Sequence, residues 1–301
     1  MLLNGGQIMD IRVLKYFLAV AREQSFSVAA ERLFLSQPTL SRQIKELEDE
    51  LGTQLLIRSS KGVTLTEEGM ILRARAEEIT ELLDKTEQEV RKSGEQVSGM
   101  VYIGAGETYA IKLIADIAKK LNADYPDIQY SIYSADASDV LEKLDRGLLD
   151  FGIVFQNVDT SKYNSVPLPQ KDTFGVLMRK DSPLAQKESI SLSDLKGQPL
   201  IIPRQPNHNS MFLDMLGIDE ESIHITAQYN LLYNGSVMAS EGMGYCICID
   251  RLINVTGDSN MCFKPFSPAI EASCSFIWKR NAVFSRAAEK YLLEFIENMK
   301  A

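Results

Sequence analysis

SQPTLSRQIKELEDELG, residues 36–52, is the stretch that decides the fold of the N-terminal part of the chain. Leu40, Ile44 and Leu47 recur at the spacing of three and four residues that places side chains on one buried face of a helix. Ser36 is a suitable N-cap, and Pro38 suits the first turn, where a helix needs no backbone N–H donor. The stretch therefore predicts an amphipathic helix packed on a small core.

The polar side chains of this helix are sorted by charge along its axis. Hydroxyl, amide and basic groups lie outside the apolar stripe, mostly toward the N-terminus: Gln37, Thr39, Ser41, Arg42 and Lys45. Acids crowd the C-terminal end, against the sign that the helix dipole favours there: Glu46, Glu48, Asp49 and Glu50. This polarity indicates a helix whose N-terminal end approaches a negatively charged partner.

The preceding segments predict two more helices. LKYFLAVAREQ (residues 14–24) and SVAAERL (27–33) have helical apolar spacing, with Ser27 as the expected N-cap of the second. The link FLS (34–36) then leads into the quoted helix. Helix, three-residue turn and helix form a helix-turn-helix, whose second helix enters the major groove of DNA with its N-terminal residues at the base edges.

The segment that follows predicts a hairpin. In TQLLIRSSKGVTLT (residues 53–66), apolar and polar residues alternate on both sides of SSKG, which predicts two short strands. They would form a wing bearing Arg58 and Lys61. An ordinary helical bundle with a surface hairpin remains an alternative, because the spacing of the turn is common in αα-hairpins.

The run FSVAAERLFLSQPTLSRQIKELEDELGTQLLIRSSKGVTLTEEG (residues 26–69) closely resembles the N-terminal signature of LysR-type transcriptional regulators. The resemblance implies a winged helix-turn-helix, a dimerising linker helix and a periplasmic-binding-protein-like effector domain. The family's base- and phosphate-contacting positions map onto Gln37, Pro38, Ser41, Arg42 and, at the wing, Arg58. Lys61 departs from the arginine more usual at its position, and lysine offers a point charge in place of a bidentate fork.

The chemistry of these side chains fits promoter DNA. Arg42 can donate two hydrogen bonds to a guanine edge, Gln37 can pair with adenine, and Pro38 can contact a thymine methyl. Hydroxyls and lysine suit phosphates, which set the register without specifying sequence: Thr39, Ser41 and Lys45. Taken singly, each of these residues could equally belong to a solvated helix face.

Composition limits the other possibilities. The 301 residues are 45% hydrophobic with a net charge of −9, and no window approaches the roughly 18 apolar residues of a membrane helix. Residues 10–65 carry eight Lys/Arg and seven Asp/Glu, a net charge of +1 on an otherwise acidic chain. The start lacks the basic and long apolar regions of a signal peptide, so we expect a cytoplasmic protein without membrane association. The four cysteines and two histidines show no zinc spacing, and we expect no metal or other cofactor.

Residues 66–94 predict a long linker helix that begins at the cap Thr66. Apolar or uncharged residues repeat along it at alternating steps of four and three, as in a coiled-coil seam: Leu72, Ala76, Ile79, Leu83, Thr86 and Val90. Such a seam needs a partner. It could pack on its own chain, but the family resemblance favours the antiparallel helix of a second subunit in a homodimer, and suggests a possible tetramer.

From residue 98 the pattern is α/β. Strand-like segments alternate with helical ones, which predicts parallel pairing with crossover helices. We predict a winged helix-turn-helix domain (9–65), the linker helix (66–94) and a two-lobed effector domain (98–301). Lobe 1 would comprise residues 98–172 and 271–301, and lobe 2 residues 173–270. Two chain crossings, near residues 172 and 270, would leave a cleft between the lobes.

Effector residues are expected where strands end, because helix N-termini present N–H groups there. Candidates in lobe 1 are Glu107, Thr108, Asp136 and Ser138, and candidates in lobe 2 are Pro203, Arg204, Gln205 and Asn230. Arg204 could anchor a small organic anion, since a guanidinium matches a carboxylate, or it could be a surface charge. Thr108 and Ser138 could instead be helix caps.

Cys246 and Cys248 raise the alternative of a redox-sensing regulator. They lie two apart in YCICI, point the same way on a strand and have no basic neighbours that would lower a thiol pKa, so we expect core packing. A two-lobed solute-binding protein is disfavoured by the DNA-binding head. An enzyme is disfavoured because no G-x-S-x-G, P-loop or H-E-x-x-H pattern occurs. The leading interpretation is a LysR-type regulator that binds a small effector and alters promoter binding.

Overall fold

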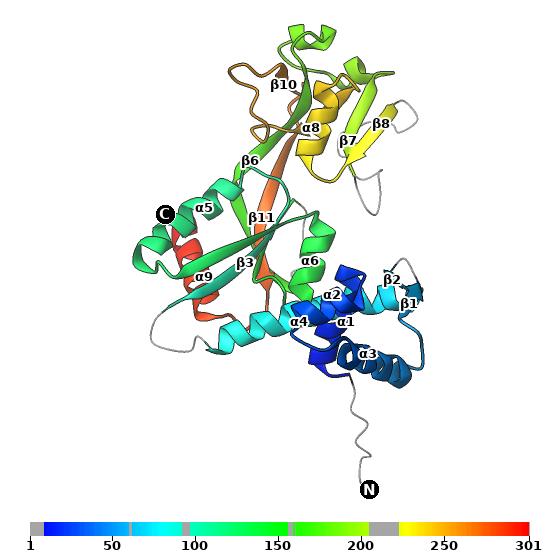
Figure 1. Ribbon diagram of the computed structural model, residues 1–301. Coiled ribbons are helices and arrows are strands. Elements are labelled where there is room, and N and C mark those ends of the chain that lie inside the picture. Colours follow the sequence, from blue (N-terminus) through cyan, green and yellow to red (C-terminus); the bar gives the residue numbers. More distant parts are fainter. Residues whose placement is uncertain are drawn as a thin grey trace. The chain divides into compact units, whose positions relative to one another are not determined.

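Figure 1 presents a computed structural model, which describes residues 9–59, 62–91, 97–155, 159, 161–204 and 223–300. The chain divides into two compact units, Met1–Arg91 and Lys92–Ala301. Each unit has a hydrophobic core of its own. No helix among these residues is long and apolar enough to cross a membrane.

The first unit opens with three helices: α1 (Ile11–Glu23), α2 (Phe26–Arg32) and α3 (Gln37–Leu51). Leu40, Ile44 and Leu47 of α3 are buried in the core of this unit, as the sequence predicts. The predicted cap of α2 is wrong. Ser25, not Ser27, is the N-cap, because Ser25 has extended backbone and its side chain accepts a hydrogen bond from the Val28 N–H.

A hairpin follows α3, as predicted. Gly52 ends the helix in the left-handed region at φ +67°, and the Glu48 carboxylate accepts the N–H groups of Leu55 and Leu56, at 2.7 and 3.0 Å. These contacts fix the start of strand β1 (Leu56–Ser59), which pairs antiparallel with β2 (Gly62–Leu65). The two buried leucines anchor the hairpin to the helical core.

Helix α4 (Glu67–Arg91) begins after Thr66, whose hydroxyl accepts the Gly69 N–H at 2.9 Å. It packs along α1. The predicted seam does not form one uniform face: Ala76 is fully buried and Leu72 packs on the core of the first unit, whereas Ile79 and Val90 are 40% and 67% exposed. Ala76, Thr80 and Lys85 are among the buried residues of α4. The exposed stripe of α4 consists of Ile71, Ile79, Leu82 and Val90.

The second unit contains nine described strands in one curled sheet: β3 (Gly99–Ala105), β4 (Ile128–Ser134), β5 (Phe151–Val154), β6 (Tyr163–Arg179), β7 (Pro199–Pro203), β8 (His224–Tyr229), β9 (Tyr245–Ile249), β10 (Met261–Pro265) and β11 (Glu271–Lys279). The sheet has the order β4-β3-β5-β11-β6-β9-β7-β8, and β10 also pairs with β6. Strands β3, β4 and β5 pair in parallel, and so do β7, β8 and β9. This confirms the predicted α/β class.

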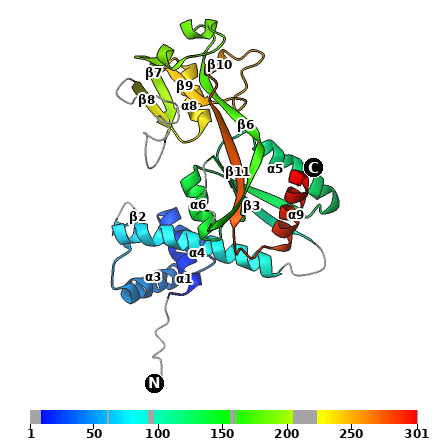
Figure 2. The same ribbon diagram turned by 180° about the vertical axis from the view of Figure 1, so that it is seen from behind.

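Two lobes are joined by the long strands β6 and β11 (Figures 1 and 2). Strand β6 pairs with β11 up to Thr173, and from Phe174 onward it pairs with β9. Lobe 1 contains β3, β4 and β5 with α5 (Ile111–Asp124), α6 (Ala137–Asp145) and α9 (Arg286–Lys300). Lobe 2 contains β7 to β10 and α8 (Leu232–Ser240). The chain thus passes from lobe 1 to lobe 2 at the residues where β6 changes its pairing from β11 to β9.

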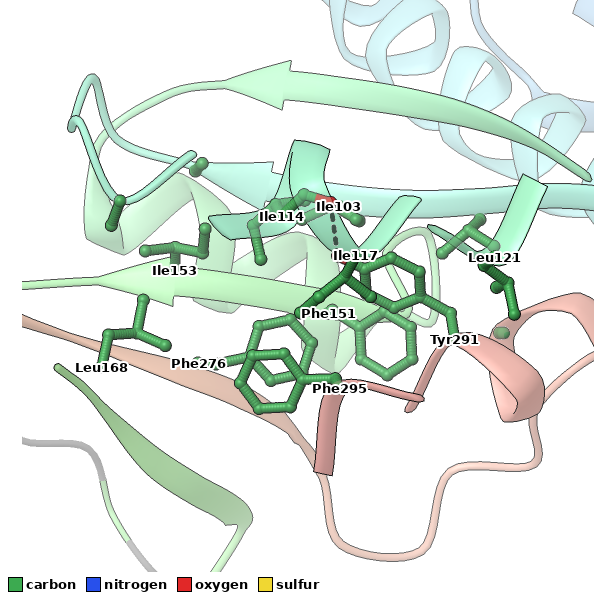
Figure 3. Packing of buried hydrophobic residues seen from close by; sticks show 14 of the residues in the cluster. Ile103, Ile114, Ile117, Leu121, Phe151, Ile153, Leu168, Phe276, Tyr291 and Phe295 are labelled. Carbon is green, nitrogen blue, oxygen red and sulfur yellow. Dashed lines mark hydrogen bonds between the residues drawn. The ribbon is translucent and has the colours of Figure 1, made fainter. Parts of the chain in front are cut away.

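The core of lobe 1 is aromatic (Figure 3). Phe276 of β11 stacks on Phe295 of α9 with ring centroids 3.9 Å apart, and on Phe151 of β5 at 5.1 Å. The Tyr291 hydroxyl donates to the Ile114 carbonyl oxygen at 3.2 Å and so ties α9 to α5. Burying each such ring contributes about 1.5–3 kcal/mol. Helix α9 therefore packs on lobe 1, to which the sequence assigned residues 271–301.

Candidate DNA interface and effector site

The N-terminal end of α3 presents the predicted DNA-contacting side chains. Ser36 caps the helix: its hydroxyl accepts the Thr39 N–H at 3.4 Å and lies 2.8 Å from the Thr39 hydroxyl. Ser41 is half-buried. The remaining predicted α3 residues are exposed at this end or on the following turns: Gln37, Pro38, Arg42 and Lys45.

Two arginines at this surface are held differently. Arg58 of β1 donates from Nη1 to Ser41 Oγ at 2.8 Å, and its guanidinium lies 4.2 Å from the centre of the Phe26 ring. Arg58 therefore ties the wing to α3 and α2, a role that sequence reasoning missed. Arg42 has Nε 3.7 Å from Glu46, and such an exposed pair restrains a guanidinium only weakly. Lys61 lies outside the described residues.

The predicted effector residues of lobe 1 are used in several ways. Thr108 is 2% exposed, and its hydroxyl donates to Asp172 at 2.5 Å and accepts the Ala110 N–H at 3.0 Å. The helix-cap alternative is wrong for Thr108, because the N-cap residue of α5 is Ala110 and no side chain caps that helix. For Ser138 that alternative is also wrong, because Asp136 caps α6 by accepting the Asp139 N–H at 3.1 Å. Ser138 is exposed on the first turn of α6.

The predicted residues of lobe 2 follow β7 and β8. Pro203 ends β7, and the Arg204 N–H donates to the Tyr229 carbonyl oxygen at 2.6 Å. Arg204 is exposed. The Asn230 side chain accepts the Leu231 N–H at 3.0 Å, just before α8. Gln205 lies outside the described residues.

Electrostatics connect Arg204 with the start of α6 in lobe 1. Burial and the carboxylates of Asp136 and Glu142 raise the pKa of Asp139, and the Arg204 guanidinium acts in the opposite direction. The Arg204 guanidinium of lobe 2 therefore interacts electrostatically with Asp139 of lobe 1. A second contact also joins the lobes: the Glu107 carboxylate accepts the N–H of Leu232, the first residue of α8.

A buried carboxylate at the crossing strand organises the loop between β3 and α5. Asp172 is 2% exposed, accepts the Thr108 hydroxyl and the Tyr109 N–H, and lies 3.7 Å from the Arg251 guanidinium. Arg251 also packs over the Tyr109 ring, 4.5 Å from its centre. Sequence reasoning missed both Asp172 and Arg251. The only signal was the position of Asp172 at the predicted crossing.

A hollow of about 950 Å³ lies beside this cluster. Its lining is largely apolar and comes from β6, β9, β10 and the loop after β9, with Tyr109 from lobe 1. Leu177, Ile253 and Phe263 are among the apolar residues that face it. None of the predicted effector residues lines this hollow, so it is a separate site from the surface around Arg204 and Glu107.

Cys246 and Cys248 are packed in a core, as the sequence predicts, whereas Cys262 is only partly buried. Cys246 and Cys248 lie on the α8 face of β9, buried beside Leu177 and Ile201. The hydrogen bond with Cys246 and burial raise the pKa of Cys248, and burial raises the pKa of Cys274 to about 12. Thiols with a raised pKa form little of the thiolate that attacks peroxide. Among the described residues, no group of three or more His, Cys, Asp and Glu is placed to hold a metal ion.

We therefore expect the buried cysteines of the folded protein to resist chemical modification. With a pKa of about 12, Cys274 is thiolate in about one molecule in 10⁵ at pH 7. A disulfide-exchange reagent should react with the buried thiols only after urea unfolding, and hydrogen peroxide should leave DNA binding unchanged. The unfolded protein, in which all four thiols are accessible, is the control. Rapid native modification of Cys246 or Cys248 with altered DNA binding would contradict the expectation.

Comparison with known families decides the identity. Residues 11–70 match the family described as bacterial regulatory helix-turn-helix protein, lysR family, and residues 94–300 match the LysR substrate binding domain. The chain belongs to the LysR family of transcriptional regulators. It therefore carries a DNA-binding head and an effector-binding domain, in a family of regulators and not of enzymes.

Individual relatives agree with this assignment. The chain is 29% identical over 286 residues to the uncharacterized HTH-type transcriptional regulator YfeR of Shigella flexneri, covering 93% of this chain and 91% of that protein. It is 34% identical over 197 residues to the hydrogen peroxide-inducible genes activator of Pectobacterium carotovorum, covering 64% of each. The crystal structure of CbnR, a LysR family transcriptional regulator, has a TM-score of 0.77 at 19% identity and covers 97% of this chain and 100% of that one. The CbnR likeness concerns the fold alone.

Proposed function

We propose that this LysR-family regulator reads promoter DNA as a homodimer through the N-terminal end of α3 and takes a small organic anion between its lobes. The observation that carries the DNA part is the exposed set on α3, with a wing arginine anchored against it. Arg42 and Gln37 would contact base edges, while Thr39, Lys45 and the wing would contact phosphates.

Fluorescence anisotropy with labelled duplexes tests the DNA part. Affinity should fall steeply with salt, because each neutralised phosphate contributes a slope of about −0.9. A duplex selected by the protein should bind at least about 10³-fold more tightly than random DNA at the same salt. Equal affinity for both duplexes would remove sequence reading from the proposal.

The effector part rests on the two facing ends of the lobes. Arg204 is exposed, its backbone N–H donates to Tyr229 just before α8, and the Leu232 N–H at the start of α8 donates to a carboxylate, so a ligand carboxylate could interact with both. Asn230, Asp136 and Ser138 would contact the rest of the ligand. A redox signal has less support, because the described cysteines are mostly buried with raised pKa values.

A thermal-shift screen of small aliphatic and aromatic carboxylates tests the effector part. A ligand at one hundred times its Kd stabilises the folded state by roughly 2.7 kcal/mol, which is easily measured. The ligand changes promoter binding only if its affinity differs between the two lobe arrangements. Each hit should therefore also shift the DNA anisotropy curve. Stabilisation by neutral amides but not by the matching carboxylates would contradict an anionic effector.

A further inference from the structure

The start of α8 lacks a cap from its own sequence. Its N-cap residue is Leu231, which has no polar side chain, and no side-chain hydrogen bond from that residue caps the helix. Helix N-termini leave N–H groups that need acceptors. Asn230 accepts one of them, from Leu231 itself. The N–H of Leu232 finds its acceptor 125 residues away, in the Glu107 carboxylate of lobe 1.

Of the helices that the structure describes, α5 and α6 also begin beside the lobe junction, and neither has a cap from the opposite lobe. Helix α6 is capped by Asp136, the residue that precedes it. At α5, the Ala110 N–H is accepted by Thr108 of the same loop, and the Tyr109 N–H by Asp172 of the connecting strand. Among these three described helices, only α8 receives its cap from the opposite lobe.

Glu107 is carried by a loop that is anchored independently of α8. Its neighbour Thr108 donates to the buried Asp172 at 2.5 Å, and Tyr109 is covered by the Arg251 guanidinium. These contacts remain when the bond to Leu232 breaks. Release of Glu107 would thus free the α8 end of lobe 2 without loosening the base of the loop.

We propose that Glu107 is an interlobe latch, a built-in anion that occupies the start of α8 until an effector carboxylate replaces it. The proposal rests on the proposed effector function. The helix dipole and the Leu232 N–H favour a negative group at this place, and two carboxylates cannot share it without repulsion. Latch and effector therefore compete, and Glu107 lowers the affinity for the effector that it resembles.

Removal of the side chain should have two opposite consequences. Glu107→Ala should lower the Tm of the full-length protein by about 2–4 °C, the shift expected for losing one helix cap in a domain of this size. It should also leave a place for an external carboxylate. Sodium propionate should restore the Tm in a saturable manner, whereas propionamide and sodium chloride at equal concentration should not.

Matched variants complete the experiment. Glu142→Ala removes an exposed glutamate that pairs with Arg146 on α6, and it should show no propionate-specific response, like the wild type. Glu107→Gln keeps an acceptor without the charge, so it should give a smaller loss and a weaker rescue. In Glu107→Ala, hydrogen exchange at the start of α8 should quicken and propionate should slow it again.

The outcomes separate the latch from the effector site. Propionate rescue requires no natural effector, so it can succeed even if the effector proposal fails. If Glu107→Ala has the wild-type Tm and α8 exchange rate, or loses stability without propionate-specific recovery, the latch is wrong. A carboxylate hit that binds Glu107→Ala more weakly than the wild type would also overturn the latch, because removal of a competing carboxylate must raise the affinity for the ligand.

Discussion

Lysine at both Ile79 and Leu82 is expected to convert the proposed dimer into monomers. These side chains are 40% and 42% exposed and belong to the exposed stripe of α4, which also includes Ile71 and Val90. An apolar stripe on a long polar helix is stabilised by a partner, and burying two ammonium groups there would cost several kcal/mol. The variant should therefore lose its partner while its head remains folded.

The loss of the dimer should appear strongly in DNA binding. Two linked heads gain about 10²–10⁴ in affinity over one, provided that the half-sites are about one helical turn, roughly 34 Å, or a multiple of that apart. Light scattering and anisotropy on a paired-site duplex measure both effects. Arg73→Ala with Glu77→Ala removes an exposed ion pair of α4 outside the stripe and should keep the dimer mass. A dimeric lysine variant would show that the stripe is not the interface.

Asp172→Ala is expected to destabilise the effector domain by on the order of 3 kcal/mol. The variant leaves the buried Thr108 hydroxyl and the Tyr109 N–H without their acceptor, and each unsatisfied group costs about 1–3 kcal/mol. The contribution of the Arg251 pair is smaller, because that arginine is 40% exposed and retains Asp250 at 2.9 Å. Asp172→Asn keeps one acceptor oxygen and should lose less.

Urea unfolding followed by tryptophan fluorescence measures this loss. Trp278, the single tryptophan, packs on the core of lobe 1 and reports its unfolding. Asp181→Ala is the control, because Asp181 pairs with Arg179 at an exposed position and its loss should stay within about 0.5 kcal/mol. Equal midpoints for the Asp172→Ala and Asp181→Ala variants would show that the buried cluster contributes little.

Local sequence pattern predicted the elements whose partners are close in sequence. Regular apolar spacing placed α3, and the alternation of strand-like and helical segments from residue 98 placed the α/β pattern of the second unit. The pattern missed the first half of β6, where Pro167 and Pro169 interrupt YNSVPLPQKD, and it missed β10 and β11. Proline removes a ladder donor and argues against a strand. Pairing with β11, about one hundred residues later, overrides that local signal.

The candidate site divides in the same way. A helix register shows which α3 side chains face outward, so sequence could select Arg42 and Gln37. It could not show that Arg58 contacts Ser41, or that Asp172 binds Thr108, because those contacts join elements by tertiary packing. The linker helix gave an intermediate result: Ala76 of the predicted seam is buried, and the exposed stripe of α4 includes Leu82, which the predicted seam did not contain.

The central claim is that the N-terminal end of α3 reads base edges, and the affinity of Arg42→Ala for DNA tests it most directly. The measurement compares wild type, Arg42→Ala and Arg75→Ala on a duplex selected by the wild type and on each of its single-base variants. Arg75 is an exposed arginine of α4 paired with Glu78, and its loss should change little. Arg42→Ala should lose about 1–3 kcal/mol on the selected duplex and lose discrimination at one base pair, with an unchanged salt slope. If Arg42→Ala binds the selected duplex and its variants as the wild type does, α3 does not read DNA through this residue and the account is contradicted.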